Sequence, residues 1–324
     1  MKTSSIAILA ALSLTACGPV DTASTSSNQP SASQSAGKTG WSINPRGDLN
    51  GLFDCLEENG STLVSAHRGG AYPGYPENAI ETIDHVLSKA PAIMEIDVAT
   101  SEDGVLYLMH DDTLDRTTTG SGRADSKKWS YISGLKLEDA SGRATSFAPS
   151  SFADTLAYAE GRTILQIDFK QSTRFEDVVD EVKRQDADDR VIYIAYSMGA
   201  ARKLHRLHPQ AMVSLSVNSQ SELNSAVAAG IPANRLLGFT GIEDPRPRLF
   251  NLLNNRDVEV IFGTLGGRRA IDKEIARTGD ESRYADLAKQ GVDILATDRP
   301  IEAQKALVSG DVAPTEGVCG IKKV

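Results

Sequence analysis

The sequence predicts an α/β protein built as a closed TIM (β/α)8 barrel with a small insertion after the second strand. Eight strand-like apolar runs alternate with segments of helical period, and eight is the number of parallel strands that closes a sheet into a barrel. No glycine-rich dinucleotide loop follows the first run, which argues against an open doubly wound sheet. The runs are residues 62–66, 93–98, 163–169, 191–196, 212–217, 235–239, 259–262 and 293–296. The helical segments include residues 78–87, 174–182, 221–228 and 283–289.

The composition and the net charge are typical of a globular domain. The 324 residues are 40% hydrophobic and 24% charged, which is enough for a substantial core, and a barrel can take up this length as one domain. With 34 Lys and Arg against 43 Asp and Glu, the net charge of −9 argues against broad binding of nucleic acid or of an anionic membrane surface. The negative net charge still allows a small positively charged pocket that binds a phosphate group. No cysteine cluster has zinc-site spacing.

Residues 1–17 are typical of a bacterial lipoprotein signal peptide. Met1-Lys2 precedes the apolar run Ile6–Leu14, which is too short to span a bilayer. Leu14-Thr-Ala-Cys17 then resembles a lipobox, in which the cysteine is lipidated and becomes the first residue. An ordinary secretory signal with a chance cysteine is the alternative. We expect Cys17 to anchor the protein to a membrane of the cell envelope, with the folded domain periplasmic or extracellular.

Two further segments are predicted from composition. Residues 18–45 are expected to form a flexible tether, because the stretch 22–35 is rich in Ser, Thr, Ala and Gln and has few apolar residues to bury. The barrel domain then covers residues 46–324. Within it, residues 111–150 are rich in Thr, Gly, Ser and Arg, and structureless loops of that length usually cap a site. We therefore expect a lid-like insertion over the barrel mouth.

Two cysteines stand near the two ends of the predicted domain. Cys55 precedes the first barrel strand and Cys319 follows the last predicted helix. In an oxidising compartment they could form a disulfide, because the first and last elements of a closed barrel are neighbours. Two free thiols are the alternative.

Three carboxylates and a lysine are predicted on the inner face of neighbouring strands. Strand side chains alternate between faces, so Glu95 and Asp97 point one way, as do Asp168 and Lys170, while the apolar residues between them face the helices. Burying three carboxylates costs several kcal/mol each without compensation. A divalent cation with oxygen ligands, Ca²⁺ or Mg²⁺, removes that cost. A structural ion-pair network with Arg68 and Lys170 is the alternative.

Two histidines follow strands that end at the same barrel mouth. His67 and His110 could act as general base and general acid on either side of a bound phosphate. His85 falls within a predicted helix. His205 and His208 form an i, i+3 pair that we place on solvent-exposed helix surface, because no acidic residue is near them in the sequence.

Six short motifs follow one another in a characteristic order. They are His67-Arg-Gly-Gly70, Pro76-Glu-Asn-Ala79, Glu95-Ile-Asp-Val98, Thr100–Gly104, His110–Thr118 and Gly291–Pro300. This order resembles the glycerophosphodiester phosphodiesterase family. The resemblance covers about residues 62–308 and implies a TIM-barrel hydrolase that splits glycerophosphodiesters into sn-glycerol 3-phosphate and an alcohol.

The resemblance also implies residue roles. It implies Glu95, Asp97 and Asp168 as metal ligands, His67 and His110 as proton-transfer groups, Arg68 and Lys170 as phosphate-neutralising groups, and Glu77 as a contact to the metal or to glycerol hydroxyls. A glycerol hydroxyl next to the phosphate could be the nucleophile, which would give a cyclic intermediate that water opens. The substrate is then a small molecule, and the lipid anchor is the only membrane contact.

Two positions and one strand depart from the family pattern. Asp168 stands where Glu is usual, which removes one methylene of reach, and Ala79 stands where Thr is usual. The seventh strand, Ile261–Gly267, lacks the typical tryptophan, so the leaving-group preference is expected to be unusual.

Two other functions compete with this one. A related barrel phospholipase D, of the lysophospholipase D or sphingomyelinase D type, would carry an exposed apolar surface beside the mouth, and the 6% aromatic content speaks mildly against that. A non-catalytic binding lipoprotein would have lost a histidine or a metal-binding acid, and none is lost. The sequence therefore favours the phosphodiesterase.

Overall fold

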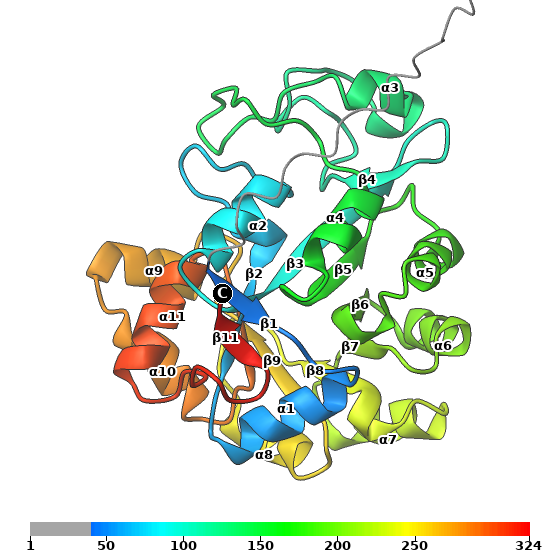
Figure 1. Ribbon diagram of the computed structural model, residues 1–324. Coiled ribbons are helices and arrows are strands. Elements are labelled where there is room, and N and C mark those ends of the chain that lie inside the picture. Colours follow the sequence, from blue (N-terminus) through cyan, green and yellow to red (C-terminus); the bar gives the residue numbers. More distant parts are fainter. Residues whose placement is uncertain (1–39) are drawn as a thin grey trace, which may run out of the picture. The chain divides into compact units, whose positions relative to one another are not determined.

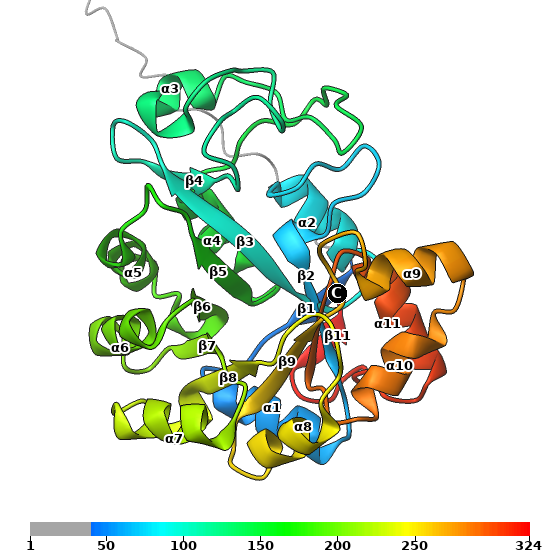
Figure 2. The same cartoon turned by 180° about the vertical axis from the view of Figure 1, so that it is seen from behind.

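Eight parallel strands close into a barrel at the centre of the molecule (Figures 1 and 2). The computed structural model describes residues 40–324. The ring closes because β2 pairs in parallel with both β10 and β3, and each predicted strand overlaps one observed strand, so the predicted fold class is confirmed. The strands are β2 (Leu63–Ala66), β3 (Ala92–Thr100), β5 (Leu165–Phe169), β6 (Val191–Ala195), β7 (Met212–Ser216), β8 (Leu236–Phe239), β9 (Glu259–Gly263) and β10 (Ile294–Thr297).

Helices surround the barrel, and their sequences show why they form. In α5, acidic residues occupy the first turn and Lys183 and Arg184 the last, which complements the helix dipole, while Val178, Val179 and Val182 face the strands. The helices are α2 (Ile80–Leu87), α4 (Phe152–Ala159), α5 (Phe175–Arg184), α6 (Met198–Leu207), α7 (Gln220–Ala228), α8 (Pro247–Asn254), α9 (Ile271–Thr278), α10 (Ser282–Ala288) and α11 (Pro300–Ser309).

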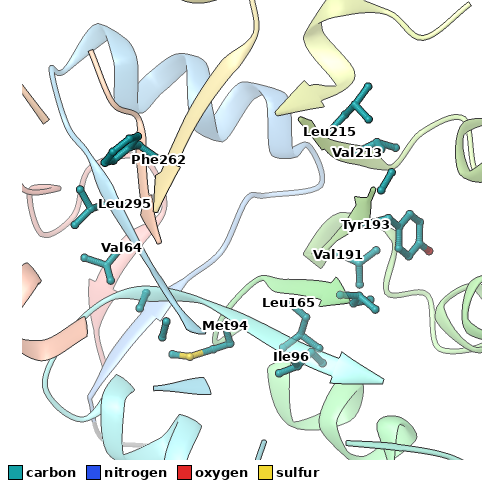
Figure 3. Close-up of a cluster of buried hydrophobic side chains, with 14 of the residues drawn as sticks. Val64, Met94, Ile96, Leu165, Val191, Tyr193, Val213, Leu215, Phe262 and Leu295 are labelled. Carbon is teal, nitrogen blue, oxygen red and sulfur yellow. The ribbon is translucent and has the colours of Figure 1, made fainter. Parts of the chain in front are cut away.

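Apolar side chains fill two layers, and strand alternation assigns each residue to one of them. Leu63 lies in the layer inside the barrel, whereas its neighbour Val64 packs between strands and helices. Figure 3 shows this outer layer around Val64, Met94 and Ile96. The inner layer meets α1 (Leu49–Glu58) at the end of the barrel where the strands begin. At the opposite end of the barrel, where the strands finish, polar side chains line the interior.

Both ends of the described chain are tied together. β1 (Trp41–Ile43) pairs antiparallel with β11 (Ile321–Lys323). Residues 41–43 therefore form a strand, whereas the sequence analysis placed them in the flexible tether. The structure joins Cys55 of α1 to Cys319 in a disulfide, with 5.6 Å between their Cα atoms. The predicted signal peptide, Cys17 and the predicted tether up to residue 39 lie outside the described residues. No helix within residues 40–324 is long and apolar enough to cross a membrane.

The insertion after β3 has a small core of its own. β4 (Leu106–Leu108) pairs antiparallel with the end of β3, and α3 (Trp129–Ile132) follows within the predicted segment. Figures 1 and 2 both place α3 at the opposite end of the molecule from α1. The insertion is therefore a packed extension of β3 and not a structureless loop. Its own cluster consists of Ala99, Tyr107, Met109, Leu114, Ala124 and Ile132.

His208 corrects one expectation. Its side chain is buried, with Nδ1 3.0 Å from the Tyr193 hydroxyl and Nε2 2.8 Å from Asp188. The prediction of an exposed position without an acidic partner was wrong for this residue. His208 caps the carboxyl end of α6, where the chain turns back toward the strands, so its ring faces the barrel.

Glu259 is a buried acid at the first position of β9. Its side chain accepts no hydrogen bond within residues 40–324, and burial raises its pKa to about 9, with the charge of Asp293 adding to the effect. The folded state therefore keeps this proton to a much higher pH than the unfolded chain, whose Glu pKa is 4.5. Consequently the free energy of unfolding falls as pH rises between those two values.

We expect Glu259→Gln to stabilise the fold at neutral and alkaline pH. Gln has the shape of the protonated acid and no proton to lose, so the gain should be small at pH 4 and reach about 1–3 kcal/mol at pH 8. Urea denaturation at pH 4, 6 and 8 measures it, with the exposed Glu160→Gln as the matched control. Parallel pH profiles for the wild type and Glu259→Gln would contradict the assignment.

Candidate active site

Three carboxylates converge near the carboxyl ends of two neighbouring strands. β3 carries Glu95 and Asp97, and β5 carries Asp168, which lies directly opposite Asp97 in the parallel register. One oxygen of each lies within 4.8 Å of an oxygen of the others. The structure thus brings together the three residues that the sequence analysis selected as metal ligands.

This carboxylate cluster fits a hard divalent cation. Asp97 is 1% exposed and Asp168 is 6% exposed, and Asp168 Oδ1 is buried without a hydrogen-bond partner. Burial raises the pKa of Glu95 to about 8, and the charge of Asp97 adds to the effect. Lys170 Nζ lies 3.0 Å from Asp97 and 3.1 Å from Asp168. Arg68 Nε lies 3.8 Å from Asp97, but these two cations do not balance three carboxylates. An all-oxygen donor set of this kind suits Ca²⁺ or Mg²⁺.

A tight turn after β2 holds the cluster from one side. The backbone N–H of Arg68 donates to Glu95 over 2.7 Å, and the Asn78 amide both donates to and accepts from Asp97. Arg68 has φ near +53°, a left-handed conformation that is strained for arginine, and Asn78 has φ near +57°, which asparagine adopts more readily. Gly70, at φ +83°, has no room for a Cβ, which would lie 2.8 Å from Pro300. The glycines after His67 are therefore required by the turn.

His67 and His110 line one cavity of about 370 Å³ together with the three carboxylates. His67 Nδ1 lies 2.7 Å from Asp298, and His110 Nδ1 lies 2.6 Å from Asp111. Assigning each Nδ1 as the donor to its carboxylate leaves both Nε2 atoms free for substrate. Burial lowers the pKa of His67, but the hydrogen bond to Asp298 and the nearby Glu95 charge outweigh it, and the net pKa is raised.

Asp298 is itself held by a buried network. Its Oδ2 accepts from the backbone N–H of Gly266, and its own N–H donates to Asp272 over 2.7 Å. Asp272, 2% exposed, also accepts from the hydroxyls of Thr297 and Tyr284. The ends of β9 and β10 and the start of α9 therefore fix the orientation of His67.

The sequence analysis assigned no role to these histidine partners. Asp298 and Asp111 both stand inside the quoted motifs, directly after Thr297 and His110, but 231 residues separate Asp298 from His67. Asp111 had a local signal, since it is adjacent to its histidine. Asp298 reaches His67 only because β10 pairs with β2 when the barrel closes.

Glu77 lies between two arginines and is not one of the three clustered carboxylates. Arg68 donates to it over 3.0 Å, and Arg116 of the insertion donates over 2.8 Å. Arg116 also reaches Asp111, and this hydrogen bond holds the pKa of Asp111 well below its usual range. Arg116 was missed by the sequence analysis, and it links the insertion to both Glu77 and the partner of His110.

The cavity wall opposite the carboxylates is largely apolar, apart from Ser214 and Ser216 of β7. Its apolar part is formed by residues of β6, β8, β9, β10 and the β9–α9 loop, while the Tyr196 hydroxyl reaches across to donate to Asp168 over 3.0 Å. The apolar lining consists of Ile194, Ala195, Phe239, Ile261, Leu265 and Ala296.

Comparisons with known proteins agree with this geometry. Residues 67–302 match the model of the glycerophosphoryl diester phosphodiesterase family. The chain belongs to this family. The matched range begins at His67 and includes every residue of the carboxylate cluster and both histidine partners.

Named relatives point to the same class of enzyme. A glycerophosphodiester phosphodiesterase of Bacillus altitudinis is 30% identical over 180 residues, which are 50% of this chain and 70% of that protein. A glycerophosphoryl diester phosphodiesterase crystal structure from Parabacteroides distasonis has a TM-score of 0.80 at 27% identity, covering 88% of this chain and 100% of the other. An Oleispira antarctica phosphodiesterase, solved with the product sn-glycerol-3-phosphate, shares the fold, with a TM-score of 0.61 at 18% identity over 76% of this chain and 97% of that one.

We expect Asp298→Asn to reduce turnover and to shift its pH dependence. The amide can still accept a hydrogen bond but carries no charge, so kcat should fall about 10- to 100-fold. Losing the carboxylate also lowers the His67 pKa, which moves the corresponding limb of the kcat/KM profile to lower pH. Rates across pH 5–9 test this, with the exposed Asp286→Asn as control. A profile superimposable on that of the wild type would rule out the orienting role.

Proposed function

We propose that this phosphodiesterase is metal-dependent and hydrolyses glycerophosphodiesters to sn-glycerol 3-phosphate and an alcohol by two-histidine acid–base catalysis. One observation carries the proposal: two histidines, each held at Nδ1 by a carboxylate, line the same cavity as three clustered carboxylates. The product found in the Oleispira antarctica relative supports the choice of product.

The charged groups of the site suit a phosphodiester. Glu95, Asp97 and Asp168 would hold one divalent cation, Ca²⁺ or Mg²⁺, which when bound supplies positive charge to stabilise the phosphoryl oxygens. Lys170 adds a cation beside the same carboxylates, and Arg68 adds another at the turn after β2. Because Glu77 pairs with Arg68, we assign it the role of positioning Arg68, in place of the contact to the metal or to glycerol hydroxyls that the family resemblance implied.

The chain's own histidines account for every proton. In the first step, one Nε2 takes the proton of the glycerol hydroxyl that attacks phosphorus, and the other histidine protonates the departing alcohol oxygen as its P–O bond breaks. This leaves a cyclic phosphate. In the second step, the histidines exchange roles, so that a water molecule loses its proton as it attacks phosphorus and the ring oxygen gains one. The products are sn-glycerol 3-phosphate and two histidines in their starting states.

The apolar cavity wall favours one second candidate, a lysophospholipase D type of activity. Phe239, Leu265 and Ile194 offer a surface that an acyl chain could contact, and Tyr196 is 76% exposed at the mouth. Comparing turnover of glycerophosphocholine with that of its monoacyl form separates the two activities.

The location in the cell is also a proposal. We propose that Cys17 carries the lipid anchor and that the domain works in the bacterial envelope, outside the cytoplasm. The Cys55–Cys319 disulfide supports an oxidising compartment. Metabolic labelling with a radioactive fatty acid, with Cys17→Ser as control, tests the anchor.

Removal of divalent metal is expected to abolish the activity. After EDTA treatment and desalting, release of glycerol 3-phosphate from glycerophosphocholine should fall to background, because the three carboxylates lose the cation that binds the phosphate. Adding back Ca²⁺ or Mg²⁺ should restore it. Full activity in a protein shown by elemental analysis to be metal-free would contradict the proposal.

We expect His67→Ala and His110→Ala each to lower kcat by about 10²–10⁴-fold, the usual contribution of a positioned acid or base. The thermal unfolding midpoint should change little, since neither ring packs in the core. His205→Ala, on α6 and away from the cavity, serves as the matched control. Wild-type turnover in either active-site variant would eliminate the two-histidine mechanism.

A further inference from the structure

A second cavity, of about 680 Å³, lies between the β8–α8 loop and α9. We call it the basic groove. Its lining is almost entirely charged, in contrast to the half-apolar catalytic cavity. The positive residues are Arg268, Arg269, Lys273, Arg277 and Arg283, and the negative ones are Glu243, Asp244 and Glu274.

Most of the positive charge in the basic groove is unpaired. Arg283 pairs with Glu274 over 2.6 Å. The other four cations have no carboxylate within 4.0 Å in the part of the chain that the structure describes, although the whole chain carries a net charge of −9. Lys273 and Arg277 stand one helical turn apart on α9, and like charges at this spacing destabilise a helix. A ligand that brings negative charge would relieve this repulsion.

The β9–α9 loop connects the basic groove directly to the catalytic cavity. Leu265 lines the catalytic cavity and Arg268 lines the groove, and three residues of extended chain span at most about 11 Å. Between them, Gly266 donates its N–H to Asp298, the partner of His67. The groove is therefore next to the His67 side of the mouth.

We propose that the basic groove binds a second phosphate carried by the alcohol part of the substrate. The inference rests on the proposed function and adds a substrate class to it: glycerophosphodiesters whose leaving alcohol is itself phosphorylated. Arginine forks recognise phosphate oxygens with paired, charge-assisted hydrogen bonds, and the groove offers Arg268 and Arg269 at the end nearest the catalytic cavity.

The acidic residues of the basic groove favour a small ligand over a polyanion or a membrane. Glu243 and Asp244 stand on the opposite wall, on the β8–α8 loop, where they would repel a long anionic polymer or a flat anionic surface. The same carboxylates can accept hydrogen bonds from the hydroxyls of a polyol. A phosphorylated polyol therefore matches both walls.

A pair of substrates that differ by one phosphate tests the proposal. For the wild-type protein, we expect KM for glycerophosphoinositol 4-phosphate to be about five- to tenfold lower than KM for glycerophosphoinositol. In Arg268→Ala/Arg269→Ala, the kcat/KM ratio between the two substrates should fall toward one. The matched control, Arg248→Ala/Arg256→Ala, removes two exposed cations outside the groove and should keep the wild-type ratio.

Several outcomes would overturn the inference. Equal KM values for both substrates in the wild type would do so, and so would a preference that Arg268→Ala/Arg269→Ala retains. An equal loss of kcat on both substrates in that variant would instead assign the arginines to support of the Gly266–Asp298 contact. Arginine-dependent sedimentation with phosphatidylglycerol vesicles, without any substrate preference, would replace the phosphate subsite by a membrane contact.

A binding measurement distinguishes failure of this inference from failure of the proposed function. If neither substrate is hydrolysed, the proposed function fails, and calorimetric titration with inositol 1,4-bisphosphate still tests the groove. Binding that is at least about tenfold weaker in Arg268→Ala/Arg269→Ala supports the phosphate site. No binding to the folded wild-type protein, or equal binding by the two proteins, excludes it.

Discussion

The crowding of three carboxylates at one point of the barrel is the constraint on which the rest of the site depends. Glu95, Asp97 and Asp168 repel one another, the last two are buried, and Lys170 balances only part of their charge. The fold accepts this arrangement because two rigid neighbouring strands fix it, and a divalent cation would make it favourable. Without a bound cation, the carboxylate cluster thus lowers the stability of an otherwise well-packed barrel.

Segments far apart in the sequence hold the catalytic groups around that cluster. The turn after β2 places His67 and donates a backbone N–H to Glu95, and the end of β10 supplies Asp298. On the other side, the insertion contributes Arg116, which ties Glu77 to the Asp111–His110 pair. His67 is therefore oriented by a residue far away in the sequence and His110 by close neighbours, so activity should depend on residues that never touch substrate.

The periodicity of the strands was sufficient to predict the barrel, and strand alternation predicted that Glu95, Asp97 and Asp168 would share a face. Tertiary contacts decided what local patterns could not. Asp298 meets His67 only after β10 pairs with β2, the insertion forms its own core around Tyr107 and Ile132, and His208 turns inward at the end of α6 to meet Tyr193. The unpaired cations of the basic groove do stand close together in the sequence, between Arg268 and Arg277, but only the folded chain places the β8–α8 loop beside them to form a groove.

Metal binding by the carboxylate cluster is the most direct test of this account. Calorimetric titration of the metal-free protein with Ca²⁺ and with Mg²⁺, for the wild type and for Asp168→Asn, measures it. The account predicts one ion bound per wild-type chain and much weaker binding by Asp168→Asn, which loses one of three charged ligands. A folded wild-type protein that binds neither ion, or an Asp168→Asn variant that binds as tightly as the wild type, would contradict it.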